Sequence, residues 1–130
     1  LANNSIMEDS GRIRMYERVI QTVLSHPFAI RGINSDYLLL GVYTHNIFLE
    51  LLYEFGIVIG EIICVWIIVK CIQTYVKSKD SIECEICMMF MLISLPQLII
   101  SHSLWTEWSF WAWIILLFKY TRYSHIYLKF

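Results

Sequence analysis

The sequence predicts an all-α membrane protein, and three observations support this fold class. Of its 130 residues, 58% are hydrophobic, 15% aromatic and only 16% charged, which is more apolar surface than a core of this size can bury. Three apolar stretches approach the roughly 20 residues that a helix needs to cross a bilayer. The formal net charge is -1, and no basic stripe suited to nucleic acid is present in the sequence.

Three transmembrane helices are expected, at about residues 57–76, 86–103 and 104–123. Polar residues such as Glu61, Pro96 and Glu107 interrupt them, so each helix needs protein neighbours rather than lipid on every side. The first residue is Leu1 and not Met. We therefore expect this chain to be the C-terminal part of a longer protein, with these helices forming a fragment of a larger multi-span bundle.

Basic residues set the expected topology. Lys and Arg occur in the loop at residues 70–85 and in the tail after the third span, whereas the turn near Trp105 has neither. By the positive-inside rule, this loop and this tail are cytoplasmic. The chain then divides into an outward-facing loop region, residues 1–56, and a region of three spans, residues 57–130.

The outward-facing region is expected to contain two short amphipathic helices. The first covers residues 10–25, with Ser10 as its N-cap and His26-Pro27 at its end. Arg12 falls within its apolar arc, and an arginine buried against apolar surface needs an anionic partner. Residues 28–43 are expected to form a loop.

The second helix is expected over residues 45–55, with Thr44 as its N-cap and Gly56 as its stop. On a helical wheel, His45 falls on the apolar side. The opposite side carries the polar residues Asn46, Glu50, Tyr53 and Glu54. We expect Glu50 on a solvated face of this helix.

The two helix starts together predict an anion site. Arg12 and His45 each project from the first turn of a face that docks on the membrane bundle. Helix N-termini add unsatisfied N–H groups and the positive end of a dipole, and a planar guanidinium can bind two phosphate oxygens together. The sequence therefore predicts a partly dry pocket for a phosphate or pyrophosphate at the outer membrane face, with an imidazole nearby.

Several short motifs follow one another ahead of the first predicted span. In order, they are Ser10-Gly11-Arg12, His26-Pro27, Arg31-Gly32, and His45-Asn46 with Leu49, Glu54 and Gly56. Their order and spacing closely resemble the C-terminal signature of bacterial O-antigen ligases and Wzy-type polysaccharide polymerases. The resemblance covers residues 10–60 by motif and the remaining spans by hydropathy alone. Members of that family have many more spans, and a further functional arginine in an upstream outer loop.

The resemblance implies a membrane glycosyltransferase of the bacterial inner membrane. Such enzymes transfer a glycan from an undecaprenyl-diphosphate carrier, to lipid A core in the ligases and to another carrier-linked repeat unit in the polymerases. The implied partners are the carrier-linked glycan, membrane lipid, the remaining transmembrane helices of the full-length protein and a chain-length regulator. The resemblance implies no metal or other cofactor, and the charge pattern described above argues against nucleic acid as a partner.

The resemblance also assigns roles to individual residues. Arg12 matches a diphosphate-binding arginine and His45 matches the histidine important for transfer, so both are expected to be catalytic. Arg31, Asn46 and Glu54 are expected to contribute to substrate binding. Simpler interpretations stay open: His45 as a helix-start residue bonded to a neighbouring carbonyl, Arg12 as a snorkelling interface residue, Arg31 as a loop charge, and Asn46 and Glu54 as supports of the loop.

Function also stays open between classes. A repeat-unit polymerase of O-antigen, capsule or exopolysaccharide is the preferred hypothesis, with an O-antigen ligase or a non-catalytic membrane module as the alternatives. In an enzyme, His45 either deprotonates the acceptor hydroxyl or binds the diphosphate as imidazolium. Cys84 and Cys87 have a C-x-x-C spacing, but a lone pair beside a span on the reducing side is interpreted as inert.

Overall fold

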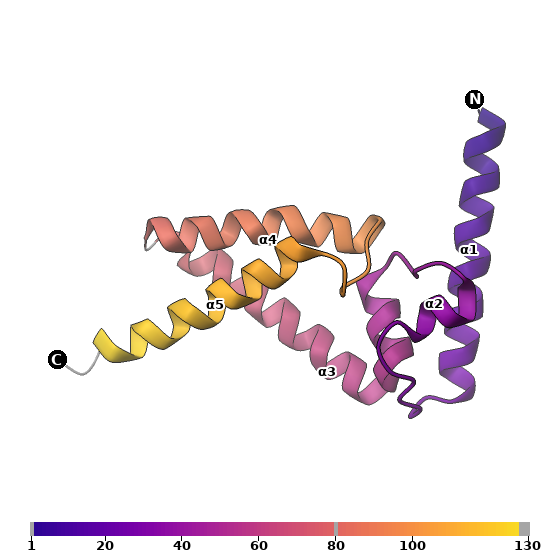
Figure 1. Cartoon of the computed structure of the whole chain (residues 1–130), viewed down its shortest axis with the longest axis horizontal. Coiled ribbons are helices and arrows are strands. Elements are labelled where there is room, and N and C mark those ends of the chain that lie inside the picture. Colours follow the sequence, from indigo (N-terminus) through magenta and orange to yellow (C-terminus); the bar gives the residue numbers. More distant parts are fainter. Residues whose placement is uncertain (1, 80, 128–130) are drawn as a thin grey trace.

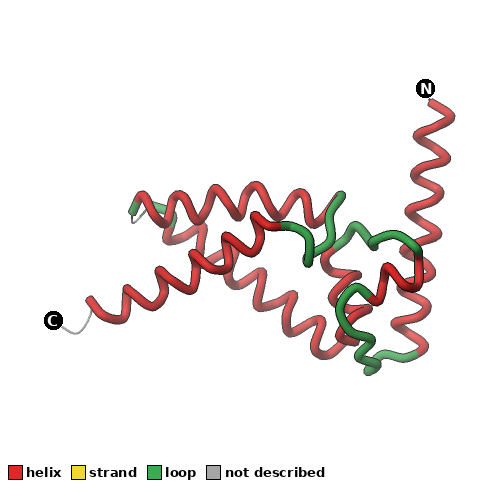
Figure 2. Tube along the Cα trace, in the orientation of Figure 1, coloured by secondary structure: helices red, strands yellow, loops and turns green. Residues whose placement is uncertain are grey.

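A computed structural model describes residues 2–79 and 81–127, with side chains at residues 11–79 and 81–119. These described residues form five helices and no strand, which confirms the all-α class (Figures 1 and 2). The helices are α1 (Ala2–Ser25), α2 (Ser35–Leu40), α3 (Ile47–Lys77), α4 (Ile82–Ile100) and α5 (Trp108–Tyr127). Helix α4 packs on α3 and α5, while α1 runs across one end of this group and packs on α3 (Figure 1).

Two of the helices, α3 and α4, are long and apolar enough to cross a membrane. The apolar part of α5 within the described residues, Trp108–Lys119, is shorter than a span. The helix boundaries differ from those expected for spans at about 86–103 and 104–123, because α4 ends at Ile100 and residues 101–107 form a loop before α5. Helices α3, α4 and α5 share a hydrophobic core that includes Trp113 and Leu98, both with no exposed surface.

The prediction for the first outer helix was wrong at its start and right at its end. Helix α1 begins at Ala2, so Ser10 lies inside it and is not its N-cap. Residues 2–9 contain no glycine or proline, and an apolar pattern alone does not detect such a polar extension. The helix ends at Ser25, two residues before Pro27, as the restriction on residues preceding proline requires. The expected loop at 28–43 contains the short helix α2.

Gly56 breaks α3 into two limbs, which we call the N-terminal limb (residues 47–55) and the C-terminal limb (residues 57–77). Its φ of 75° and ψ of 169° are not helical, so the predicted stop is a kink within one longer helix. The loop at residues 27–32 binds the backbone groups that the kink frees. The carbonyl of Glu54 accepts from the Arg31 and Gly32 N–H groups at 2.7 and 3.1 Å, and the Ile57 N–H donates to the Pro27 carbonyl at 2.7 Å.

The kink requires glycine for two reasons. A positive φ strains residues that carry a Cβ, and a Cβ on Gly56 would lie 3.0 Å from the Pro27 carbonyl oxygen. Four residues later, a Cβ on Gly60 would lie 2.8 Å from the Leu51 carbonyl oxygen. The C-terminal limb therefore folds closely against the N-terminal limb, and this contact fixes how the outer region sits on the candidate span.

Arg31 connects the C-terminal end of α1 to the residues before this kink through hydrogen bonds. Its guanidinium donates to the carbonyl oxygens of Thr22 and Tyr53, both at 3.0 Å, and more weakly to those of His26 and Ala29 at 3.3 and 3.4 Å. It also lies over the Tyr53 ring, 4.7 Å from the centroid. Five donors in a planar fork suit this many carbonyls, so Arg31 acts as a clamp between three segments.

Candidate functional site

Arg12 and His45 line one pocket between α1 and the segment that joins α2 to α3. The pocket has a volume of about 580 Å³. Its lining residues are Gly11, Arg12, Arg14, Met15, Arg18, Leu40, Val42 and His45. The structure thus brings together the two residues expected to be catalytic, although Arg12 is exposed and not buried in an apolar face as the wheel suggested.

His45 is held in an uncommon conformation. Its φ is 53°, a left-handed value that few residues other than glycine adopt, and such values cluster at functional sites. Its Nδ1 lies 2.6 Å from the carbonyl oxygen of Ser101, in the loop that follows α4. A carbonyl oxygen only accepts, so Nδ1 carries the proton and donates it. In the neutral ring, Nε2 is then the acceptor.

The residues on both sides of His45 are fixed by hydrogen bonds. Asn46, not Thr44, is the N-cap of α3, and its side-chain oxygen accepts from the backbone N–H groups of Phe48 and Leu49 at 3.1 and 3.2 Å. Thr44 instead donates to Asp36 Oδ2, from its backbone N at 2.9 Å and from Oγ1 at 2.6 Å. His45 therefore precedes the helix instead of starting it, and its backbone is anchored at each neighbour.

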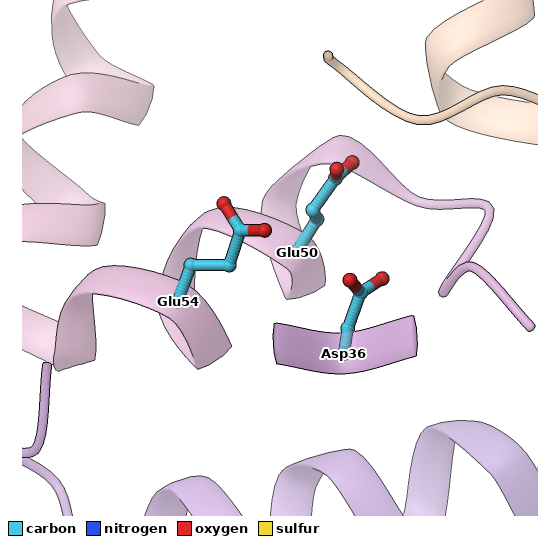
Figure 3. A group of neighbouring side chains, drawn as sticks. All are labelled: Asp36, Glu50 and Glu54. Atoms are coloured by element: carbon cyan, nitrogen blue, oxygen red, sulfur yellow. The ribbon is translucent and has the colours of Figure 1, made fainter. Parts of the chain in front are cut away.

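Three buried carboxylates gather beside this segment, where α2 meets the N-terminal limb of α3 (Figure 3). Asp36, Glu50 and Glu54 have no exposed surface, and one oxygen of each lies within 4.8 Å of the others. We call these three residues the carboxylate cluster. The expectation of a solvated Glu50 is wrong, because the polar side of the second outer helix faces inward.

Donors distant in the sequence explain why the cluster is buried. Glu50 accepts from Ser103 Oγ and from the Leu104 N–H at 3.0 Å. Glu54 accepts from the Asn34 N–H and from Trp105 Nε1 at 2.8 Å. These bonds join α2, α3 and the loop at residues 101–107, which holds the Ser101 carbonyl opposite His45.

The cluster carries more negative charge than its neutral donors can easily balance. Burial, together with the charges of Glu50 and Asp36, raises the pKa of Glu54 to about 7, although the hydrogen bonds from Trp105 and Asn34 oppose this rise. Burial likewise raises the pKa of Glu50. The three carboxylates are the described group that could hold a metal ion, but each of their six oxygens already accepts a hydrogen bond. The raised pKa values of Glu50 and Glu54 favour the protonated forms of these two carboxyl groups.

The other expected substrate-binding residues lie outside the pocket. Arg31 directs its donors at carbonyl oxygens, Asn46 caps α3, and Glu54 belongs to the carboxylate cluster. These positions match the structural interpretations of the three residues, and their contact with substrate stays a prediction.

Sequence reasoning missed two features of the site. Arg14 and Arg18 also line the pocket. They follow Gly11 by three and seven residues, and residues with this spacing share one face of a helix. This spacing could have identified them from the sequence. The carboxylate cluster gave no such signal, because it depends on donors from a separate loop.

Comparison with models of known protein families, with curated proteins and with solved structures found no match to this chain. The hypothesis about its activity therefore rests on the motifs in its own sequence. The pocket that contains Arg12 and His45 adds a geometric argument that is independent of those motifs.

Proposed function

We propose that this chain belongs to a membrane glycosyltransferase that polymerises the repeat units of a surface polysaccharide, such as O-antigen, capsule or exopolysaccharide. The observation that carries the proposal is the single pocket that Arg12 and His45 line. The enzyme would act at the outer face of the bacterial inner membrane as a multi-pass protein, with the loop between α3 and α4 on the cytoplasmic side. The remaining helices of the full-length protein would complete a cavity for the carrier lipid.

The proposed reaction is a displacement at the anomeric carbon of the carrier-linked glycan. The bond between C1 and the diphosphate oxygen breaks, and its electron pair leaves with the diphosphate, where Arg12 stabilises the growing negative charge. The acceptor hydroxyl forms the new bond to C1 and gives its proton to His45 Nε2. The hydrogen bond from Nδ1 to Ser101 supports a role as base because it orients the ring and leaves Nε2 as the acceptor.

A substitution that preserves the fold tests this role. Asparagine tolerates positive φ and keeps a side-chain N–H for the Ser101 carbonyl, but it has no group equivalent to Nε2. We expect His45→Asn in the full-length gene to reduce transfer by about 100-fold or more, in the range that general bases contribute. Surface glycan length on gels is the first readout, and the transfer rate of purified protein in nanodiscs is the second.

Two controls make the experiment specific. His102→Asn changes a histidine of the outer loop that does not line the pocket, and it should leave glycan length unchanged. A transfer rate that falls on the acid side of the pH–rate profile favours the role as base, whereas higher activity at low pH would favour the imidazolium role. Unchanged long chains from a well-expressed His45→Asn variant would remove the enzyme hypothesis.

The same strains distinguish a polymerase from a ligase. Where the polysaccharide is O-antigen, loss of a polymerase would leave single repeat units on the lipid A core. Loss of a ligase leaves long chains on the carrier and none on the core. The polymerase proposal predicts the first pattern for His45→Asn.

A further inference from the structure

The carbonyl group that orients the His45 ring lies in a loop, so its position depends on what holds that loop. The Ser101 oxygen accepts from His45 Nδ1 at 2.6 Å, and residues 101–107 belong to no helix. A segment outside regular secondary structure depends on side chains and turns for the partners of its backbone groups. The side chain that binds this loop next to Ser101 is that of Glu50.

Glu50 binds the loop through both of its carboxylate oxygens. Oε1 accepts from Ser103 Oγ, and Oε2 accepts from the Leu104 N–H at 3.0 Å. All three residues are buried, where hydrogen bonds are stronger than in water. Glu50 itself lies in the N-terminal limb of α3, which begins directly after the segment that contains His45. One rigid element therefore connects the histidine to the loop that supplies its acceptor.

We infer that Glu50 is a positioning residue, which holds the 101–107 loop so that the Ser101 carbonyl keeps the His45 ring oriented, with Nε2 as the acceptor in the pocket. This inference rests on the proposed function, because it concerns the same histidine. Glu50 acts through Ser101 and needs no contact with substrate. The role depends on the length of its side chain and on two hydrogen-bonding atoms, and a negative charge is not required.

Two substitutions separate side-chain length from charge. In Glu50→Gln, Oε1 can accept from the Leu104 N–H while Nε2 donates to Ser103 Oγ, because a hydroxyl oxygen also accepts. Burial raises the pKa of Glu50 and favours its neutral form, so the neutral amide is close to the native state. We expect Glu50→Gln in the full-length protein to keep at least about half of the wild-type transfer rate.

Glu50→Asp keeps the charge but is one methylene shorter, so it cannot make both bonds unless the loop moves. We expect its kcat to fall by about tenfold, in the range that misplacement of a catalytic group causes. The KM for the carrier-linked glycan should not change, because the loss concerns orientation of the base. Both constants are measured with purified protein in nanodiscs.

A double-mutant cycle with His45→Asn tests whether Glu50 acts through the histidine. In the His45→Asn background, Glu50→Asp should lower the residual rate by less than about twofold, because the group that it positions is already absent. General damage to the fold would instead lower the residual rate by the same factor as in the wild type. If Glu50→Asp does not fold, Ser103→Ala provides the same cycle through loss of one donor.

Ser109→Ala is the matched control. It removes another buried serine that donates to a carboxylate, but its acceptor is Glu107 and not Glu50, so transfer should change by less than about twofold. Independent losses in the cycle, or a Glu50→Gln variant as slow as Glu50→Asp, overturn the inference even if His45→Asn abolishes transfer. Unchanged transfer in His45→Asn removes the proposed function itself.

Discussion

The outer region and the span region of this chain are stabilised in different ways. In the outer region, residues 11–56 and 101–107, side-chain hydrogen bonds join segments more than 50 residues apart, as between Glu50 and Ser103 or His45 and Ser101. The second region, which we call the span region, comprises residues 57–100 and 108–119 and includes α5, which is shorter than a span. Its buried hydroxyl groups at Thr74 and Ser94 donate to carbonyls of their own helix, and Thr74 also accepts from Trp113 Nε1. Hydrogen bonds to buried carboxylates therefore position the outer region, whereas apolar packing, together with the bond from Trp113 to Thr74, positions the helices of the span region.

This difference leads to an expectation about mutations and pH. A buried polar group that loses its partner is strongly destabilising, and buried carboxylates link stability to protonation. Single polar substitutions and pH should therefore affect the outer region more than the span region. Three predictions test this comparison, in order of decreasing effect.

The largest effect is expected at the kink. Gly56→Ala combines the strain of a positive φ with a contact of 3.0 Å to the Pro27 carbonyl oxygen, and it should lower the free energy of unfolding by about 3 kcal/mol or more. Thermal unfolding in detergent, followed by tryptophan fluorescence, measures the loss. Gly41→Ala is the matched control, because Gly41 has a φ of 73° but no atom within 4 Å of its Cβ. Equal losses in the two variants would show that the contact with the 27–32 loop contributes nothing.

The second prediction concerns pH. The pKa of Glu54 is about 7 in the folded state, against an ordinary value of 4.5, so the folded state binds more protons between these values. The stability that Glu54 contributes is therefore present below about pH 4.5 and is lost as pH rises through about 7, by an amount on the order of 3 kcal/mol.

Unfolding measured at a series of pH values between 4.5 and 8 tests this loss. Glu54→Gln, which stays neutral, should flatten the slope, and Glu17→Gln on the exposed side of α1 should leave it unchanged. A wild-type stability that rises across this window would contradict the sign of the prediction.

The smallest effect is expected in the span region. Trp113 is fully buried and donates from Nε1 to Thr74 Oγ1 at 3.1 Å. Thr74→Val removes this acceptor while keeping the shape of the side chain, and it should lower the free energy of unfolding by about 1 kcal/mol. Ser94→Ala, which removes a bond within one helix, should change it less. If Thr74→Val proves as damaging as Gly56→Ala, the contrast between the two regions fails.

The sequence predicted the parts of this fold that depend on local signals. Proline at position 27 marks a helix end, and glycine at position 56 marks a break that was expected to be a helix stop and is a kink within α3. Apolar length likewise identified α3 and α4 as candidate spans. Arg12 and His45 were linked through motif order, and the structure places both at one pocket.

The predictions that were wrong concern residues whose positions depend mainly on contacts between distant segments. The wheel placed Glu50 and Glu54 on the polar side of a helix, and Glu50 was expected on a solvated face. Their burial depends on donors at Ser103, Leu104 and Trp105, in a loop whose position no local pattern specifies. The true N-cap, Asn46, was missed for a simpler reason, since Thr44 two residues earlier also fits a capping position.

The bond between His45 and Ser101 has a consequence for how the site responds to its surroundings. Ser101 follows directly on α4, and the Ser101 and His102 N–H groups both bind the Gln97 carbonyl oxygen at 2.8 Å, so the acceptor moves with the end of that helix. Helices that span a bilayer tilt to match its thickness. A thicker or thinner bilayer that tilts α4 would thus shift the alignment of the imidazole, and lipid composition becomes a variable that any assay of this protein has to hold constant.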